Sequence, residues 1–206
     1  MKRLLIATSN PAKLDEYRLL LESSDIDCVS LADAGIREHP EETGSTFAEN
    51  ALLKARFYFG RAAIATLADD GGLEIDALGG EPGVHSHRWL GGGAENSDAS
   101  LVAEVMRRMR GVPDGRRTAR IASALALTFR TGTGELRELV EQDSLEGVIA
   151  PVPLPRIRPG FPYRSVLWLP ERRCYLGELG DREEARLSQR RKALLRLAPE
   201  LRHIAV

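Results

Sequence analysis

The chain has 206 residues, of which 43% are hydrophobic and 29% charged, which is ordinary for a soluble globular protein with a sizeable core. A formal net charge of -1 gives no general attraction to nucleic acid or to an anionic membrane. Two distant cysteines make neither a disulfide framework nor a zinc cluster, so we expect a reducing cytoplasm. The apolar run at residues 4–7 is too short for a signal peptide or a membrane span.

The first elements are a strand, a helix and a second strand. Residues 4–7 predict a short buried strand. Asn10 and Pro11 then predict a helix start, because Asn caps helices well and Pro suits the first helical position. The apolar spacing continues this helix to about residue 21, and a second strand is expected at 26–31.

A second helix and an acidic strand follow. Thr46 and Glu49 fit a capping box, and the helix that they open is expected to end at Gly60. The apolar run at residues 63–68 predicts a buried strand that ends at the pair Asp69-Asp70, where two glycines stop it.

The rest of the chain mixes helices and strands. We expect a half-exposed strand at 73–77, an amphipathic helix at 97–109, a strand at 119–129 with its return strand at 136–140, a proline-rich loop at 151–162, a strand at 165–169 and a basic helix at 181–197. Because several of these strands are joined as hairpins, the sheet should be mixed and not purely parallel.

The first candidate site is the helix start at residues 8–13. Free backbone N–H groups and the helix dipole favour an anion there. Thr8 and Asn10 can add side-chain donors, and Lys13 brings a positive charge that a first helical turn disfavours without a nearby anion. The segment therefore suggests a phosphate site, with an ordinary cap and a solvated lysine as the alternative.

The second candidate is the pair Glu41-Glu42, which precedes the helix that carries Asn50 and Lys54. The spacing of Asn50 and Lys54 puts them on one helix face. A carboxylate and a lysine beside a phosphate suit metal-assisted phosphoryl chemistry. A solvated acidic loop with a surface lysine is the alternative.

The third candidate is the pair Asp69-Asp70. Adjacent carboxylates at the end of a buried strand repel each other unless a cation or a proton lies between them. Mg²⁺ usually takes one or two carboxylates together with substrate phosphates. The pair therefore suggests a metal site. The alternative is a turn at the end of the strand, with both carboxylates in solvent.

The fourth candidate combines Phe161 and Tyr163 with the distant segment Ser188-Gln189-Arg190. Aromatic side chains in a loop can stack on a nucleobase, and polar side chains can read its edge. Taken alone, these residues are better explained as core aromatics and a basic surface helix. His85 and His87 lack partners at metal-ligand spacing and are expected on a loop or surface.

Together these segments resemble the inosine triphosphate pyrophosphatase family. The motifs that carry the resemblance are Ala7 to Lys13, Glu41 to Gly44, Thr46-Phe47, Glu49 to Ala51, Lys54-Ala55, Ala68 to Asp70, Gly72 to Glu74, Gly79 to Gly83, Ser86 and Arg88. The match from Glu146 to Arg190 is weaker.

The resemblance implies an α/β fold with an elongated mixed central sheet flanked by helices, as a single domain over residues 1–206 with two lobes and a central cleft. It also implies a homodimer. The implied reaction is the Mg²⁺-dependent hydrolysis of non-standard purine nucleoside triphosphates (ITP, dITP, XTP) to the monophosphate and pyrophosphate, a house-cleaning activity.

The resemblance also assigns residues by position. Glu42 and Asp70 look like the metal pair, and Asp70 also matches the family's proposed general base. The substrate contacts that it implies are Thr8, Asn10, Lys13, Asn50, Lys54, Gly71, Phe161, Tyr163, Arg164, Gln189 and Arg190.

Gly71 stands where the family usually has Ser. Every clear departure after Gly71 falls in the part that reads the base: Arg164 replaces an aspartate, Gln189 replaces a histidine, and Glu184 aligns with a family lysine. Arg164 cannot accept a hydrogen bond as an aspartate can, so nucleobase selectivity is expected to be altered or relaxed.

Our interpretation is a pyrophosphatase for non-standard purine nucleotides in the cytoplasm, with Mg²⁺ as cofactor and neither nucleic acid nor membrane as a partner. One alternative is the same reaction on a different nucleotide. The other is a non-catalytic nucleotide-binding protein on this fold, which would have less need for Lys13, Glu42, Lys54 and Asp70 together.

Overall fold

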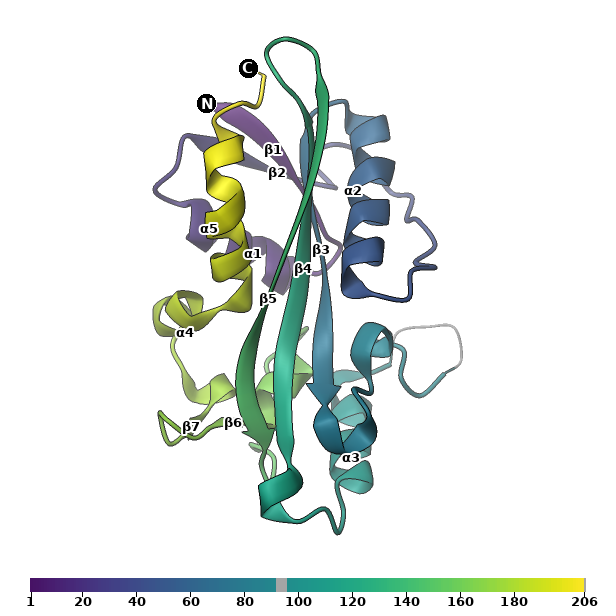
Figure 1. The fold of residues 1–206 in the computed structure, drawn as a ribbon, viewed down its shortest axis with the longest axis vertical. Helices are drawn as coiled ribbons and strands as arrows, with labels where there is room; N and C mark the ends of the chain where they lie inside the picture. Colours follow the sequence, from purple (N-terminus) through teal and green to yellow (C-terminus); the bar gives the residue numbers. More distant parts are fainter. Residues whose placement is uncertain (92–95, 206) are drawn as a thin grey trace. The chain divides into compact units, whose positions relative to one another are not determined.

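The computed structural model describes residues 1–91 and 96–205, and the chain divides into two compact units (Figure 1). Unit 1 comprises Met1–Asp70, Ser123–Asp143 and Leu187–Val206. Unit 2 comprises Gly71–Ala122 and Ser144–Arg186. Within the described ranges, no helix is long and apolar enough to cross a membrane.

The sheet is mixed, as the sequence predicts. Its seven strands are β1 (Lys2–Ala7), β2 (Ile26–Ser30), β3 (Ala65–Ile75), β4 (Thr118–Arg130), β5 (Leu136–Ile149), β6 (Leu167–Leu169) and β7 (Cys174–Tyr175). They follow the order β2-β1-β3-β4-β5-β6-β7. In unit 1, β1 is parallel to both β2 and β3, whereas in unit 2 β6 is antiparallel to both β5 and β7.

The helices are α1 (Pro11–Leu21), α2 (Phe47–Ala62), α3 (Asp98–Arg108), α4 (Asp181–Leu187) and α5 (Gln189–Leu201). The described residues also form the short 3₁₀ turns η1 (Asp76–Leu78), η2 (Gly83–His85), η3 (Asp114–Arg116), η4 (Pro162–Ser165) and η5 (Leu176–Glu178). The prediction of an α/β fold is confirmed.

The core of unit 1 lies between the sheet and the helices α1 and α5. Leu4 and Ile6 alternate along β1 toward this core, where Tyr17 of α1 and Leu197 of α5 cover them together with Phe129 of β4. Helix α2 packs against β1 and lies on the other side of the sheet from α1 and α5 (Figure 1). Each face of β3 in this unit therefore meets a different set of helical side chains.

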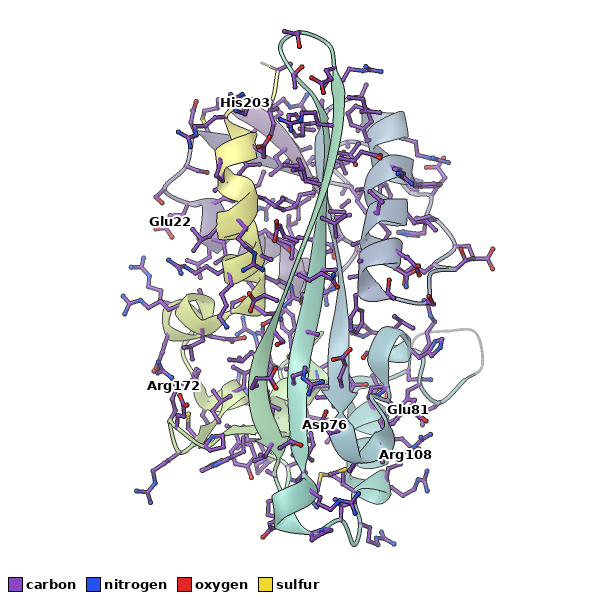
Figure 2. The ribbon with its side chains drawn as sticks, viewed as in Figure 1. Glu22, Asp76, Glu81, Arg108, Arg172 and His203 are labelled. Atoms are coloured by element: carbon purple, nitrogen blue, oxygen red, sulfur yellow. The ribbon has the colours of Figure 1, made fainter. Side chains whose placement is uncertain are left out.

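Unit 2 has its own core and a buried arginine. Leu101 and Val105 of α3 are fully buried, and α3 packs against η4. The guanidinium of Arg117 donates to four backbone carbonyls at 2.7 to 3.1 Å, so this buried cation is satisfied without a carboxylate. At the surface of α3, Arg108 pairs with Glu81 (Figure 2).

Both predicted helix starts are confirmed. Asn10 accepts a hydrogen bond from the Ala12 backbone N–H at 3.0 Å, with Pro11 as the first helical residue. Thr46 and Glu49 form the complete capping box of α2. The predicted end at Gly60 is wrong, because α2 continues to Ala62 and closes on Ala63 in the left-handed conformation.

The acidic strand differs from its prediction. The sequence predicts a strand end at Asp69-Asp70, but β3 continues from Ala65 to Ile75. It therefore includes residues 73–75 of the strand predicted at 73–77, whose last two residues belong to η1 instead. The glycines allow a close contact instead of a break: a Cβ on Gly72 would lie 1.9 Å from the Ser86 hydroxyl. Asp69 and Asp70 are therefore residues of a continuous strand.

The prediction of one continuous basic helix at 181–197 is also wrong, because the segment forms α4 and α5. It is interrupted at Ser188, whose hydroxyl accepts from the Arg190 N–H at 3.1 Å and so caps α5. The return strand β5 is longer than predicted and reaches Ile149, and the short strand β7 was not predicted.

Candidate functional site

The continuous strand β3 separates the two acidic side chains. Successive side chains of a strand point to opposite faces of the sheet. Asp69 therefore faces α1 and α5, and Asp70 faces α2. Each carboxylate has its own cationic partners, so the repulsion expected between adjacent carboxylates is relieved without a shared ion.

Asp69 lies in a closed ionic cluster of unit 1. It pairs with Lys13 of α1 and with the Nε of Arg190 of α5, the latter at 2.5 Å. The Tyr17 hydroxyl donates, at 3.1 Å, to the same Asp69 carboxylate oxygen that Arg190 contacts. Glu16 accepts from Arg190 at 3.3 Å, so two cations face two carboxylates in this cluster.

The Asp69 carboxylate is inaccessible to solvent and ionised. The Asp69 side chain is 1% exposed and that of Arg190 5%. Burial raises the pKa of Asp69, but Arg190 and Lys13 outweigh it and hold this pKa well below its usual value. Burial and the Asp69 charge raise the pKa of Tyr17. These features are typical of a structural ion-pair network.

Asp70 lies in a more open cluster with residues of α2 and the loop before it. Lys54 donates to one Asp70 oxygen at 2.8 Å and contacts the Glu42 carboxylate at 3.2 Å. The Asn50 amide donates to the other Asp70 oxygen at 3.4 Å. The structure thus brings together Glu42, Asn50, Lys54 and Asp70, as the sequence predicts.

The Asp70 cluster is partly exposed. The Asp70 and Glu42 carboxylates both contact Lys54, and their side chains are 12% and 23% exposed. Burial raises the pKa of Asp70 above its usual value, against the lowering effect of Lys54 and Lys13. Burial alone would lower the pKa of Lys54. The Asp70 and Glu42 charges outweigh burial and raise this pKa, so Lys54 stays protonated.

A hard divalent cation fits this cluster when water or a substrate phosphate completes its shell. The described residues contain no group of three or more His, Cys, Asp or Glu side chains that could hold a metal ion. Mg²⁺ usually binds through one or two carboxylates plus substrate phosphates and water. Glu42 and Asp70 provide those two carboxylates.

The helix start that contains Thr8 and Asn10 is arranged as a cap. The Thr8 hydroxyl accepts from the Asn10 N–H at 3.1 Å, and the Asn10 side chain caps α1. The anion that the lysine in the first turn requires is present within the protein, because Lys13 pairs with Asp69. Lys13 thus links this helix start to the acidic pair.

The residues predicted to read the base are buried in this structure. Phe161, Tyr163 and Arg164 belong to unit 2 and are 5 to 8% exposed. The Arg164 guanidinium lies 3.4 Å above the Phe161 ring centroid and pairs with Glu184 at 2.6 Å. Tyr163 donates its hydroxyl hydrogen bond to the Ser86 carbonyl.

Gln189 and Arg190 belong to unit 1, and Gly71 directly follows Asp70 as the first residue of unit 2. Gln189 donates to the Ser123 hydroxyl at 3.1 Å, and Arg190 is held by Asp69 and Glu16. Sequence reasoning missed Tyr17 and Glu16. The spacing of Lys13 and Tyr17 on one face of α1 could have indicated Tyr17, whereas nothing local links Glu16 to Arg190.

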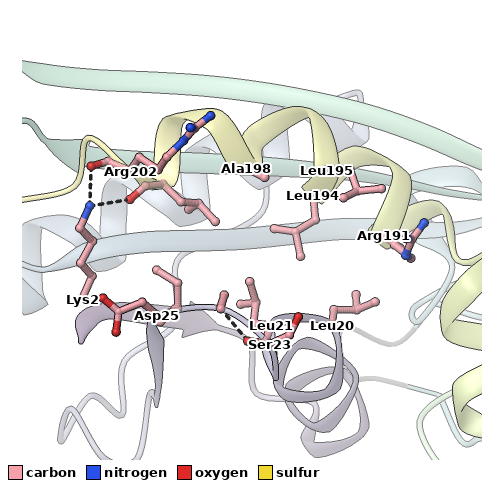
Figure 3. Close-up of a pocket in the computed structure, with 13 residues that line it drawn as sticks. Lys2, Leu20, Leu21, Ser23, Asp25, Arg191, Leu194, Leu195, Ala198 and Arg202 are labelled. Carbon is pink, nitrogen blue, oxygen red and sulfur yellow. Dashed lines mark hydrogen bonds between the residues drawn. The ribbon is translucent and has the colours of Figure 1, made fainter.

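A separate pocket of about 560 Å³ lies in unit 1 between α5, the end of α1 and the start of β2 (Figure 3). Leucines of both helices form its walls, among them Leu20 and Leu194. Lys2 donates to the Leu201 carbonyl at 3.3 Å and to that of Arg202 at its edge. This pocket shares no residue with either acidic cluster.

The fold and the site together define an α/β protein with a carboxylate–lysine cluster suited to a metal-bound phosphate. The chain belongs to the Ham1 family, whose profile matches residues 4–200. This membership confirms the resemblance that the sequence motifs carry.

Similar proteins cover nearly the whole chain. A dITP/XTP pyrophosphatase of Geobacillus kaustophilus is 42% identical over 96% of this chain and 93% of its own. One of Bacillus subtilis is 38% identical over 96% of both chains. The structure of a HAM1 protein from Coxiella burnetii covers 98% of both chains at 33% identity with a TM-score of 0.81.

Proposed function

We propose that this chain is a nucleoside triphosphate pyrophosphatase that hydrolyses ITP, dITP and XTP to the monophosphate and pyrophosphate with Mg²⁺. The observation that carries the proposal is the partly exposed cluster in which the Glu42 and Asp70 carboxylates converge on Lys54. The prediction of a hydrolase that acts on nucleoside triphosphates is confirmed by the curated relatives, which are named dITP/XTP pyrophosphatases.

In this proposal Asp70 is the general base. Its carboxylate takes a proton from water while the water oxygen bonds to the α-phosphorus and the bond from the α-phosphorus to the bridging oxygen breaks. Pyrophosphate leaves with that oxygen. The hydrogen bonds from Lys54 and Asn50 hold the Asp70 carboxylate in place for this role.

The cations neutralise charge on the triphosphate. Lys54 is held beside Asp70 by two carboxylates, and an ammonium has three donors, so it can also contact a phosphate oxygen. Lys13 is paired with Asp69, so at the start of α1 its charge only adds to the helix dipole that, together with Thr8 and Asn10, favours an anion. Mg²⁺ held by Glu42 and Asp70 would stabilise the charge that develops on the leaving group.

A panel assay tests the proposal. Pyrophosphate release is measured from ITP, dITP, XTP, the standard nucleotides and modified pyrimidine triphosphates, with Mg²⁺ and with EDTA. We expect release from the first three nucleotides with Mg²⁺ only. Turnover of a different nucleotide would favour the first alternative, and binding without any turnover would favour the non-catalytic reading.

The pairing of Arg164 with Glu184 favours the purine substrates over a different nucleotide. Read from the sequence, these residues are two separate departures from the family's aspartate and lysine. In the structure they form one buried ion pair, with side chains 6% and 8% exposed. A reversed pair leaves the summed charge at this place unchanged, so the two departures compensate each other. We propose that base selectivity is retained.

A charge reversal tests this part of the proposal. Arg164→Asp alone places a second carboxylate beside buried Glu184 and should lower stability by about 3 to 5 kcal/mol. Arg164→Asp combined with Glu184→Lys should restore both the thermal midpoint and the wild-type ranking of substrates. A double variant that folds but prefers standard purines would show that the reversed pair sets a different selectivity.

Three predictions from the sequence remain to be tested. They are the homodimer, the cytoplasmic location and a single domain over residues 1–206 with one central cleft. Size-exclusion chromatography with light scattering tests the first of these.

A further inference from the structure

We propose that Asn50 is a positioning residue that holds the Glu42 loop against Asp70 for a divalent cation, and that it does not contact the nucleotide. The inference rests on the proposed function, because it assigns a role toward the same metal pair. It replaces the interpretation of Asn50 as a substrate contact.

The Asn50 side chain bridges two segments that carry the carboxylates. It is 1% exposed. Its oxygen accepts from the Gly44 backbone N–H at 2.8 Å, and its amide group donates to Asp70 at 3.4 Å. Gly44 follows Glu42 by two residues, so one amide fixes both the loop backbone and the strand carboxylate.

Only a small neutral side chain with both a donor and an acceptor meets these demands. An amide offers one oxygen and two N–H donors. An apolar side chain would leave the Gly44 N–H without its bond, and a carboxylate would face Asp70 with a like charge. The fit is close, because a Cβ on Gly44 would lie 2.6 Å from the Asn50 oxygen.

The same face of α2 anchors the rest of the loop. Lys54, one turn after Asn50, contacts the Glu42 and Asp70 side chains. Tyr58, one turn further, has its hydroxyl 3.0 Å from His39 Nδ1. Three residues at successive turns therefore hold the loop from His39 to Gly44, and Asn50 is the one that ties its backbone to Asp70.

Bonds that orient metal ligands matter for affinity. Loss of such an outer partner typically costs 10- to 100-fold in metal affinity or activity. A nucleotide contact would have a different signature, because its loss raises the KM for the nucleotide while metal binding to the free protein stays unchanged. The two roles can therefore be separated.

The experiment measures Mn²⁺ binding to the full chain without nucleotide, from the electron paramagnetic resonance signal of free Mn²⁺. Asn50→Ala should weaken Mn²⁺ binding about 10- to 100-fold. At saturating Mg²⁺ its KM for dITP should equal that of the wild type. Thr46→Ala is the matched control, because it removes the cap of the same helix but neither bond of the Asn50 side chain, and its Mn²⁺ affinity should be unchanged.

A second variant keeps the test decisive if Asn50→Ala does not fold. Gly44→Ala pushes the loop away from an intact Asn50 and should weaken Mn²⁺ binding in the same way. Wild-type Mn²⁺ affinity in either folded variant, or no Mn²⁺ binding by the wild type, would overturn the proposal. Failure of the proposed function would be seen separately, as a lack of pyrophosphate release by the wild type.

Discussion

At the residue scale, the central feature is that Asp69 and Asp70 are neighbours in sequence but belong to different clusters. Asp69 is enclosed by Lys13, Tyr17 and Arg190, whereas Asp70 shares Lys54 with Glu42. Alternation along β3 produces this division. Asp69 thus serves the stability of unit 1, and Asp70 is the residue assigned to the chemistry.

Asp70→Asn should lower kcat for dITP about 10²- to 10⁴-fold, because the amide cannot take a proton from water. Its free energy of unfolding at pH 7 should be no lower than that of the wild type. Burial raises the pKa of Asp70 in the folded state, so its ionised form costs stability above that pKa and the neutral amide avoids this cost. Steady-state kinetics check the first expectation and urea unfolding the second. A kcat of the variant equal to that of the wild type would show that Asp70 is not the general base.

Asp69→Asn should have the opposite profile and lower stability by about 3 to 5 kcal/mol at pH 7, because buried Lys13 and Arg190 lose the carboxylate that they share. The folded-state pKa of Asp69 is depressed, so its contribution is present above the unfolded value and is lost as pH falls. The stability gap to the wild type should therefore narrow below about pH 4. Urea unfolding across pH measures this gap, and equal midpoints at pH 7 would contradict the ionic cluster.

The sequence could predict much of the Asp70 cluster but not that of Asp69. Helical spacing put Asn50 and Lys54 on one face, and the resemblance added Glu42 and Asp70. Arg190 was expected at the base, but it pairs with Asp69, which lies 121 residues away in the chain. No local pattern encodes a contact at that separation, since it depends on how α5 packs on the sheet.

At the scale of elements, local chemistry predicted where helices begin better than where strands end. Asn10 and Thr46 cap their helices as expected, because a cap is decided within four residues. The glycines after Asp70 were interpreted as a strand end, but they continue β3 past Ser86. A glycine pair signals either a turn or a close approach, and only the tertiary packing decides between them.

Two glycine substitutions test this interpretation. Gly72→Ala should destabilise the protein by about 1 to 3 kcal/mol, because its Cβ would meet the Ser86 hydroxyl at 1.9 Å and the Gly83 carbonyl at 2.8 Å. Gly60→Ala is the control. It lies inside α2 with no atom within 4 Å of the added Cβ, and it should stabilise by about 0.5 to 1 kcal/mol. Thermal unfolding compares the two variants. Equal unfolding midpoints for Gly72→Ala and Gly60→Ala would contradict the close contact at Gly72.

At the scale of the whole molecule, family membership and the Asp70 cluster lead to the same reaction. The Ham1 profile extends over residues 4–200, and the cluster is contained within unit 1. The mixed sheet was predictable from the alternation of helices with hairpin-connected strands. The order of its seven strands was not, because strand order depends on long-range pairing.

Hydrolysis of dITP in ¹⁸O-labelled water tests the central claim most directly, because the label marks the phosphorus that water attacks. If Asp70 directs water to the α-phosphorus, dIMP carries the ¹⁸O and the released pyrophosphate is unlabelled. Label in the pyrophosphate, or release of labelled orthophosphate, would contradict the proposed reaction.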